Sequence, residues 1–277
     1  QQHHDNYIVY EYTFTNTGNT NADAAIELPA QILDSLYIFL QYRYAVAKDA
    51  FDYFANSARW GINTMNDSRG DGLTPATTFF PGNLDNDVRA QYAWQGRHPS
   101  YTLYDNIGGS LWNRVRSGFP TDTTGRLAAA QFIGVVTLHA DTSPTDTTNN
   151  LQQPRTTLYV GSDDPLNSSN SQFNTAQMQK EYALMSYGHM SPRHADKVGT
   201  GTDPSIDVNG ASSSGGQSCA QGYGPYRLLP GQSIRIVMAE GAAGLSREAC
   251  LEIGRAYKAS NGNNALLING KTKNDWV

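Results

Sequence analysis

Charged residues are scarce in this chain. Asp, Glu, Lys and Arg make up 16% of its 277 residues, against about a quarter in ordinary soluble domains, and the formal net charge is −5. Nucleic-acid binding requires clustered Lys and Arg, and no basic run occurs, so the sequence argues against a nucleic-acid partner. Asn, Thr, Ser, Gln and Gly must supply the polar surface instead. Together with 16 Tyr, this composition is typical of secreted β proteins.

Long apolar runs are also missing. A membrane-spanning helix needs about 20 consecutive apolar residues, and the longest candidate, Leu36–Leu40, is followed directly by Gln41. We therefore expect no membrane-spanning segment. The chain starts at Gln1 without an initiator Met and ends abruptly on KNDWV. We expect a trimmed product of a polypeptide that continues beyond residue 277, located outside the cell or at its surface.

Cysteine is nearly absent, with only Cys219 and Cys250. Their spacing fits no metal-binding motif. In an oxidising compartment the two could form a disulfide worth roughly 3–4 kcal/mol by the loop-entropy model. The alternative is two isolated thiols, one of them buried on a helix.

Recognisable catalytic motifs are missing as well. The chain contains no G-x-S-x-G, Walker loop, HExxH or CxxC. Carboxylates are present at Asp67, Asp85, Asp87 and Glu240, but no spacing pairs two of them as glycoside hydrolysis requires. The sequence thus leaves enzymatic activity open and leans against it.

Strand patterns dominate what is present. Residues 8–15 (IVYEYTFT) alternate in the two-residue period of a strand and lead into the turn sequence Asn-Thr-Gly-Asn. A strand is also predicted after the Pro230-Gly231 turn, with Ile234, Ile236 and Met238 on one side. Further strands are predicted over residues 34–46, 128–139 and 156–160, although a helix within 31–54 is an alternative.

Two helices are indicated by capping residues followed by apolar spacing. Asn174 and Ser246 are both favourable N-caps. The apolar stripes are Met178, Tyr182 and Met185 in the first helix, and Cys250, Ile253 and Tyr257 in the second. Residues 56–125 are rich in Gly, Pro, Asn and Asp and are predicted to be a loop-rich insertion. We predict a mainly β protein: one elaborated β-sandwich domain over 1–277, with long loops and two short α-helices.

Two segments resemble the immunoglobulin-like β-sandwich modules of secreted bacterial surface proteins. YEYTFTNTGNT is similar to a strand of these modules that runs into an N-T-G-N turn, and LLPGQSIRIVMAE is similar to their L-x-P-G-x-S turn and strand. Together they cover 24 of the 277 residues. The resemblance implies an extracellular setting and a role in adhesion, carbohydrate binding or scaffolding, and it supplies no catalytic residues.

The tripeptide His-Ala-Asp occurs twice, at His139–Asp141 and at His194–Asp196. Residues i and i+2 of a strand point to the same face, so each His can lie beside its Asp. A metal site is one hypothesis, and transition metals accept such ligands. Its candidate ligands are His139, Asp141, His189, His194 and Asp196. The alternative is strand-end and turn histidines whose neighbouring Asp residues cap turns.

A second group of acids lies in NDSRGDG and LDNDVR. Oxygen ligands near glycines suit Ca²⁺, although the spacing is not that of an EF-hand. Asp67, Asp71, Asp85 and Asp87 are therefore candidate ligands of a structural Ca²⁺, with ordinary Asx turns as the alternative.

Aromatic residues are interleaved with polar ones in the 56–125 segment. Flat rings beside amides and carboxylates suit sugar recognition, and exposed rings also mark protein–protein contacts. The candidate ligand-binding residues are Trp60, Tyr92, Trp94, Tyr101, Tyr104 and Trp112. Packing beneath the loops as a satellite core is the alternative.

These observations favour a secreted or cell-surface β protein without catalytic activity. Its expected partners are a glycan or other copies of itself, in an adhesive or self-assembling filament or layer. A polysaccharide-acting hydrolase or lyase on a β-sandwich is the alternative, and a metal-dependent enzyme built on the histidine pairs is a third hypothesis.

Overall fold

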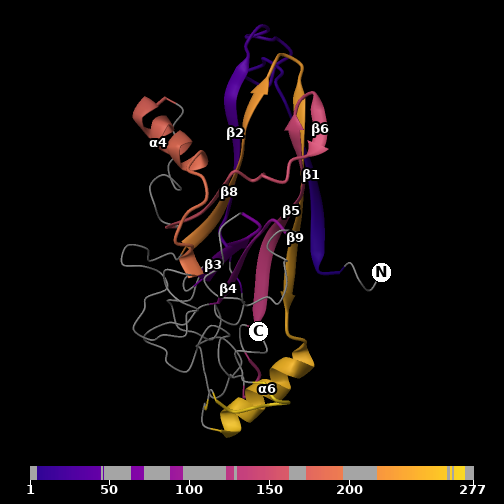
Figure 1. Cartoon of the computed structure of the whole chain (residues 1–277), viewed down its shortest axis with the longest axis vertical. Coiled ribbons are helices and arrows are strands. Elements are labelled where there is room, and N and C mark those ends of the chain that lie inside the picture. Colours follow the sequence, from indigo (N-terminus) through magenta and orange to yellow (C-terminus); the bar gives the residue numbers. More distant parts are fainter. Residues whose placement is uncertain are drawn as a thin grey trace.

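The structure is a computed structural model, and it describes residues 5–44, 46, 64–71, 88–95, 123–127, 130–161, 173–195, 217–260, 263 and 265–271. Within these residues the protein is mainly β, with two antiparallel sheets and two helices, as the sequence predicts (Figure 1). The helices are α4 (Thr175–Met185) and α6 (Arg247–Ala259). No described helix is both long and apolar enough to cross a membrane.

The first sheet has six strands, in the order β1-β9-β5-β4-β3 with β6 paired to β5. Its strands are β1 (Tyr7–Thr15), β9 (Ser233–Gly244), β5 (Gln131–Ser143), β4 (Ala90–Gln95), β3 (Thr64–Arg69) and β6 (Asp146–Asn149). The second sheet has three strands in the order β2-β8-β7. They are β2 (Leu33–Tyr42), β8 (Gln217–Leu228) and β7 (Thr156–Gly161).

The main core lies between the two sheets. In β9 the predicted alternation is confirmed, because Ile234, Ile236 and Met238 are buried while the residues between them are more accessible. Tyr223 and Leu228 of β8 pack against them. Burial of large apolar side chains from both sheets, at roughly 1.5–3 kcal/mol each, holds the layers together.

Asn16 explains how β1 ends. Its backbone N–H donates to the Gln232 carbonyl oxygen, so the strand still pairs at this point. Its buried side-chain amide turns inward and donates to the carbonyl oxygens of Gln31 (2.8 Å) and Leu228 (3.0 Å). The Asn of the predicted turn therefore ties the end of β1 to the second sheet.

Both predicted helix caps are confirmed. The side chain of Asn174 accepts the N–H of Gln177, and that of Ser246 accepts the N–H of Ala249. The stripe of α6 packs as expected through Ile253 and Tyr257. The stripe of α4 does not, because none of its residues is buried and the helix projects beside β2 (Figure 1).

Two predictions about strands are wrong in part. The strand expected over 34–46 ends at Tyr42, and the helical alternative is wrong for its described part. The segment expected to be loop contains β3 and β4. Their sequences, TMNDSR and AQYAWQ, lack an alternating apolar pattern because their buried side chains are mostly polar.

Candidate functional site

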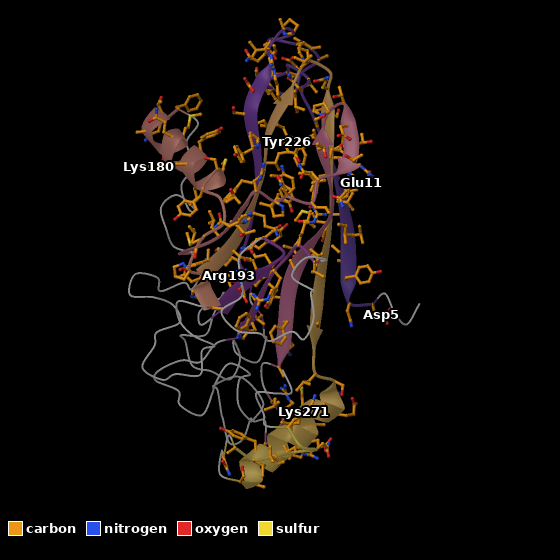
Figure 2. The ribbon with its side chains drawn as sticks, in the orientation of Figure 1. Asp5, Glu11, Lys180, Arg193, Tyr226 and Lys271 are labelled. Atoms are coloured by element: carbon orange, nitrogen blue, oxygen red, sulfur yellow. The ribbon has the colours of Figure 1, made fainter. Side chains whose placement is uncertain are left out.

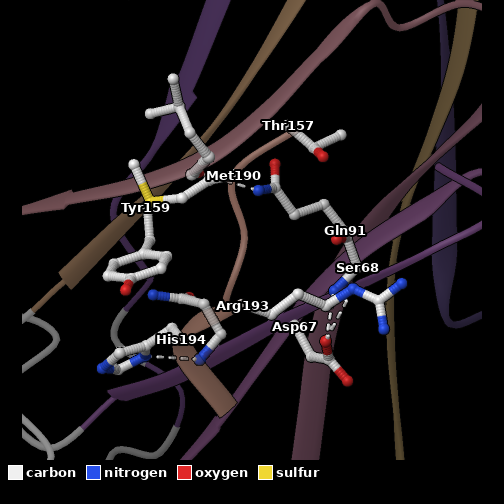
Figure 3. A pocket seen from close by; sticks show the side chains of 10 residues that line it. Asp67, Ser68, Gln91, Thr157, Tyr159, Met190, Arg193 and His194 are labelled. Atoms are coloured by element: carbon white, nitrogen blue, oxygen red, sulfur yellow. Dashed lines mark hydrogen bonds and ion pairs between the residues drawn. The ribbon is translucent and has the colours of Figure 1, made fainter. Parts of the chain in front are cut away.

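A cluster of buried polar side chains lies where β3, β4 and β7 meet the segment 188–195 (Figure 3). We call it the polar junction. Its members are Asn66, Asp67, Ser68, Arg69, Asp71, Gln91, Tyr92, Thr157, His189, Arg193 and His194. The cavity at its centre measures about 10 Å³, close to the space that one water molecule requires.

Asp67 occupies one side of the junction. One carboxylate oxygen, Oδ2, contacts Arg69 Nη1 at 2.5 Å and accepts the Tyr92 hydroxyl at 3.2 Å. Its Oδ1 accepts the N–H of Ser68 and lies 3.7 Å from Arg193 Nε. Burial raises the pKa of Asp67 above its ordinary value, while the neighbouring Arg69 opposes that rise.

Asp71 occupies the other side and joins three separate segments. Its Oδ1 accepts from Arg193 Nη2 at 2.9 Å. Its Oδ2 accepts the hydroxyls of Ser68 at 2.5 Å and Thr157 at 3.1 Å. The two acids thus face two arginines, and the buried charges balance.

His194 and His189 cover the edges of two strands. The ring Nδ1 of His194 accepts the backbone N–H of Asn66 at 3.1 Å, which satisfies the outer edge of β3. His189 forms a parallel bridge with Thr157, whose N–H donates to Gly188 while its carbonyl accepts from Met190. The segment 188–195 therefore closes the edges of β3 and β7 together.

The imidazole of His189 donates through Nδ1 to the Thr157 hydroxyl (2.9 Å), because that hydroxyl uses its own proton on Asp71. Burial lowers the pKa of His189 below its ordinary value; Asp71 opposes this shift, and Arg155 and Arg193 add to it. The folded state therefore binds this proton less readily than the unfolded state. Neutral His189 therefore contributes to the free energy of unfolding. This contribution is complete above the pKa of His in the unfolded state, about 6.5, and is lost as the pH falls through the pKa of His189 in the folded state.

We therefore expect the melting temperature to fall as the pH drops from about 7 to 5, and to fall less in His189→Gln. Glutamine keeps a donor for Thr157 but does not titrate. Thermal unfolding of both proteins across this range measures the difference. Parallel curves for the two proteins would show that His189 makes no contribution.

The hypothesis of a metal site joining the two histidine triplets is wrong for its described residues. Among them no group of three or more His, Cys, Asp or Glu side chains could hold a metal ion. His139 Nε2 contacts Asp141 Oδ1 at 2.7 Å, as the i, i+2 spacing predicts, but Asp141 Oδ2 is already accepting the N–H of Arg235. His189 and His194 lie apart from this pair, in the polar junction, and Asp196 is outside the described residues.

The predicted calcium ligands are only partly placed. Asp67 and Asp71 do come together, but they pair with Arg69 and Arg193. Two guanidinium groups against these carboxylates leave the charge already compensated, which disfavours a cation. Asp85 and Asp87 lie outside the described residues.

The described aromatics of the predicted ligand-binding set form a small core. Tyr92 and Trp94 stack at 5.7 Å between ring centroids, and Phe132 lies 5.9 Å from Trp94. For these two residues the packing alternative is therefore confirmed. Trp60, Tyr101, Tyr104 and Trp112 are outside the described residues.

Cys219 and Cys250 are both free in this structure, so the predicted disulfide is not formed. Cys219 is buried beside Tyr44 and Ala93, whereas Cys250 lies on α6 beside Leu127. The two thiols belong to different clusters. The alternative of isolated thiols, one on a helix, fits the structure.

A second candidate site is the outer edge of β1. The strand pairs with β9 on one side, and nothing in the described residues pairs with its other side. Asn6 and Asn16 bond to the β9 side, so in this regular ladder the even-numbered residues face β9. The odd-numbered residues from Val9 to Thr15 direct their N–H and C=O groups outward.

The other described sheet edges differ in how far they are covered. The segment 188–195 covers β3 and β7, and β6 has only four residues. β2 is also an edge strand, ten residues long, and the Tyr182 hydroxyl of α4 donates to its Ser35 carbonyl at 2.9 Å. Long uncovered edges are templates for pairing with another chain. β1 differs from β2 because it exposes large apolar side chains, from Tyr7 to Tyr10, whereas β2 exposes none.

Comparison with protein-family models, curated proteins and solved structures gave no match to this chain. The resemblance to immunoglobulin-like modules stays a prediction. The fold and the two candidate sites define a mainly β, sandwich-like protein with a closed polar interior and an open sheet edge.

Sequence reasoning did not identify Arg69 and Arg193 as partners of the acids. Both are buried, with 7% and 3% of their surface exposed. The sequence did contain a signal, because charged residues are few in this chain. Arg69 lies two residues after Asp67, and Arg193 directly precedes the second histidine triplet.

Proposed function

We propose that this chain is a non-catalytic structural module that acts outside the cell or at its surface and assembles with copies of itself by extending its six-stranded sheet at β1. The observation that carries the proposal is the outer edge of β1 from Val9 to Thr15, with which no other described strand pairs. Ile8 is 60% exposed and Val9 is 50% exposed, in the part of the strand that precedes Glu11. Burying such residues against another copy removes apolar surface from water.

The polar junction supports a structural role in preference to catalysis. Glycoside hydrolysis needs two carboxylates, one able to donate a proton and the other facing the substrate. Asp67 and Asp71 are both engaged by arginines, and the small cavity that Asp67 lines suits a water molecule. The junction joins the two sheets and keeps the edges of β3 and β7 closed.

Low surface charge also suits an assembling module. Tyr, Asn and Thr can enter an interface without the desolvation cost of burying ions. In β1, Glu11 carries the single charge, and its neighbours Tyr10 and Tyr12 stack as a ladder 6.1 Å apart. Glycan binding remains a prediction for the aromatics outside the described residues.

Substituting Val9 by Pro tests the proposal. Val9 directs its N–H outward, so Pro removes a donor from the free edge and leaves the bonds to β9 in place. Sedimentation velocity of the wild-type chain, at concentrations from about 1 to 100 μM, should show reversible association. Val9→Pro should weaken it at least tenfold, about 1.4 kcal/mol.

Leu151→Ala is the matched control, because Leu151 is an exposed apolar residue away from β1 and its loss should leave association unchanged. Val9→Lys is a second variant, which keeps the backbone N–H but places like charges at the paired edges. Weaker association in this variant as well would show that the effect of Val9→Pro does not come from a folding defect. A wild-type chain that stays monomeric, or variants that associate as well as the wild type, would refute the proposal.

A further inference from the structure

Resting on the proposed function, we infer that the partner of β1 is the same strand of a second copy, antiparallel to it and related by a two-fold axis at Val9. In this arrangement Val9 lies opposite Val9, and Ile8 of each copy lies opposite Tyr10 of the other. The two six-stranded sheets then become one continuous sheet.

The backbone limits the choice of register. Outward groups belong to the odd-numbered residues, so an antiparallel partner must place odd residues opposite odd residues. A two-fold pair satisfies this only when its axis passes through a residue position, and not midway between two residues. Val9 is such a position, and its N–H and C=O face outward, so Val9 and its copy form a hydrogen-bonded pair.

Repulsion between like charges excludes two other positions of the two-fold axis. An axis at Glu11 would set that carboxylate opposite its own copy, and an axis at Ile8 would set Glu11 opposite Asp5. Like charges directly opposite each other destabilise a strand pair. With the axis at Val9, Glu11 lies opposite Tyr7 instead.

The exposure of apolar side chains then favours an axis at Val9 over an axis at Tyr10. Ile8 and Val9 are the most exposed large apolar residues of the strand, and Tyr10, which follows them, is 36% exposed. An axis at Val9 pairs these three positions only with one another, giving one aliphatic pair and two aromatic–aliphatic pairs. An axis at Tyr10 would set Val9 opposite Glu11. Aromatic and β-branched cross-strand pairs are the favourable ones.

This geometry predicts a closed contact. A two-fold interface uses the same patch on both copies and is complete when two copies have met. Association through β1 therefore stops at a dimer, and any larger filament or layer requires a second surface.

Cysteine cross-linking tests the register. Three single variants, Val9→Cys, Thr13→Cys and Thr15→Cys, are made in a Cys250→Ser background, which leaves the fully buried Cys219 as the remaining thiol. Opposed residues of a hydrogen-bonded pair have Cα atoms about 5.5 Å apart, within disulfide range. Residue 15 and its copy would be about 40 Å apart along the strands.

Under oxidised glutathione, Val9→Cys should form a disulfide-linked dimer at least tenfold faster than Thr15→Cys, because its effective thiol concentration is in the millimolar range. Faster cross-linking at Thr13 or Thr15 would overturn the register. If the chains associate in sedimentation without cross-linking at Val9, the contact lies elsewhere and only this inference fails. If they do not associate at all, the proposed function fails with it.

Discussion

Replacing Arg193 with Met is expected to lower the free energy of unfolding by about 3–5 kcal/mol, because it leaves two buried carboxylates without their shared cation. Arg193 contacts Asp71 at 2.9 Å and Asp67 at 3.7 Å, and its side chain is almost fully buried. Because Met fills a similar volume, the loss in free energy of unfolding comes mainly from electrostatics and only to a small extent from packing. Urea unfolding, with midpoints compared at constant m value, measures it.

Arg235→Met provides the control. Arg235 also pairs with an acid, Glu11, but at 3.6 Å and with both side chains about half exposed. Figure 2 shows Glu11 on β1, away from Arg193. Exposed pairs contribute about 0–1 kcal/mol, so this variant should unfold close to the wild type. The double variant Arg193→Met/Asp71→Asn should recover part of the loss. Equal effects of Arg193→Met and Arg235→Met would contradict the view that the polar junction holds the two sheets together.

Much of the fold follows directly from the sequence. β1 and β9 have regular alternation of apolar and polar residues, and both helix caps are short-range patterns that involve only the first turn. Such features depend on neighbouring residues alone. They could therefore be predicted without knowing which parts of the chain meet.

β3 and β4 could not be predicted in this way. The polar side chains of Asp67 and Arg69 are tolerated in a buried strand because Tyr92 and Arg193 complete their hydrogen bonds. Those partners come from other segments, and Arg193 lies more than a hundred positions along the chain. Local patterns carry no information about such compensation.

The histidine triplets illustrate the same limit. His139 and Asp141 are two residues apart on one strand, and their contact at 2.7 Å follows from strand geometry. His194 instead accepts from Asn66, a residue of a different sheet strand. The same tripeptide thus makes two unrelated kinds of contact. In the first copy the histidine contacts an acid of its own strand, and in the second copy it accepts a hydrogen bond from the edge of another strand.

The pattern of edge protection connects the polar junction with the proposed assembly. The segment 188–195 contacts the edges of β3 and β7, a tyrosine contacts β2 at Ser35, and β6 is short. Covering strand edges is a common way to prevent unwanted pairing. Among the described edges β1 exposes the large apolar side chains, and for that reason we propose it as the edge that pairs.

Amide hydrogen exchange at two protein concentrations is the most direct measurement of the central claim that copies meet through β1. At about 100 times the dissociation constant, association stabilises the bound strand by about 2.7 kcal/mol, so outward amides should exchange about 100-fold more slowly than in dilute solution. With the axis at Val9, Val9 pairs with its copy and Glu11 pairs with Tyr7 of the other copy, so the protection covers Val9 and Glu11 and leaves Thr15 unchanged. The amides of Ile8 and Tyr10, already facing β9, should respond far less. Exchange in β1 that does not depend on concentration, or protection confined to another surface such as α4, would contradict the account.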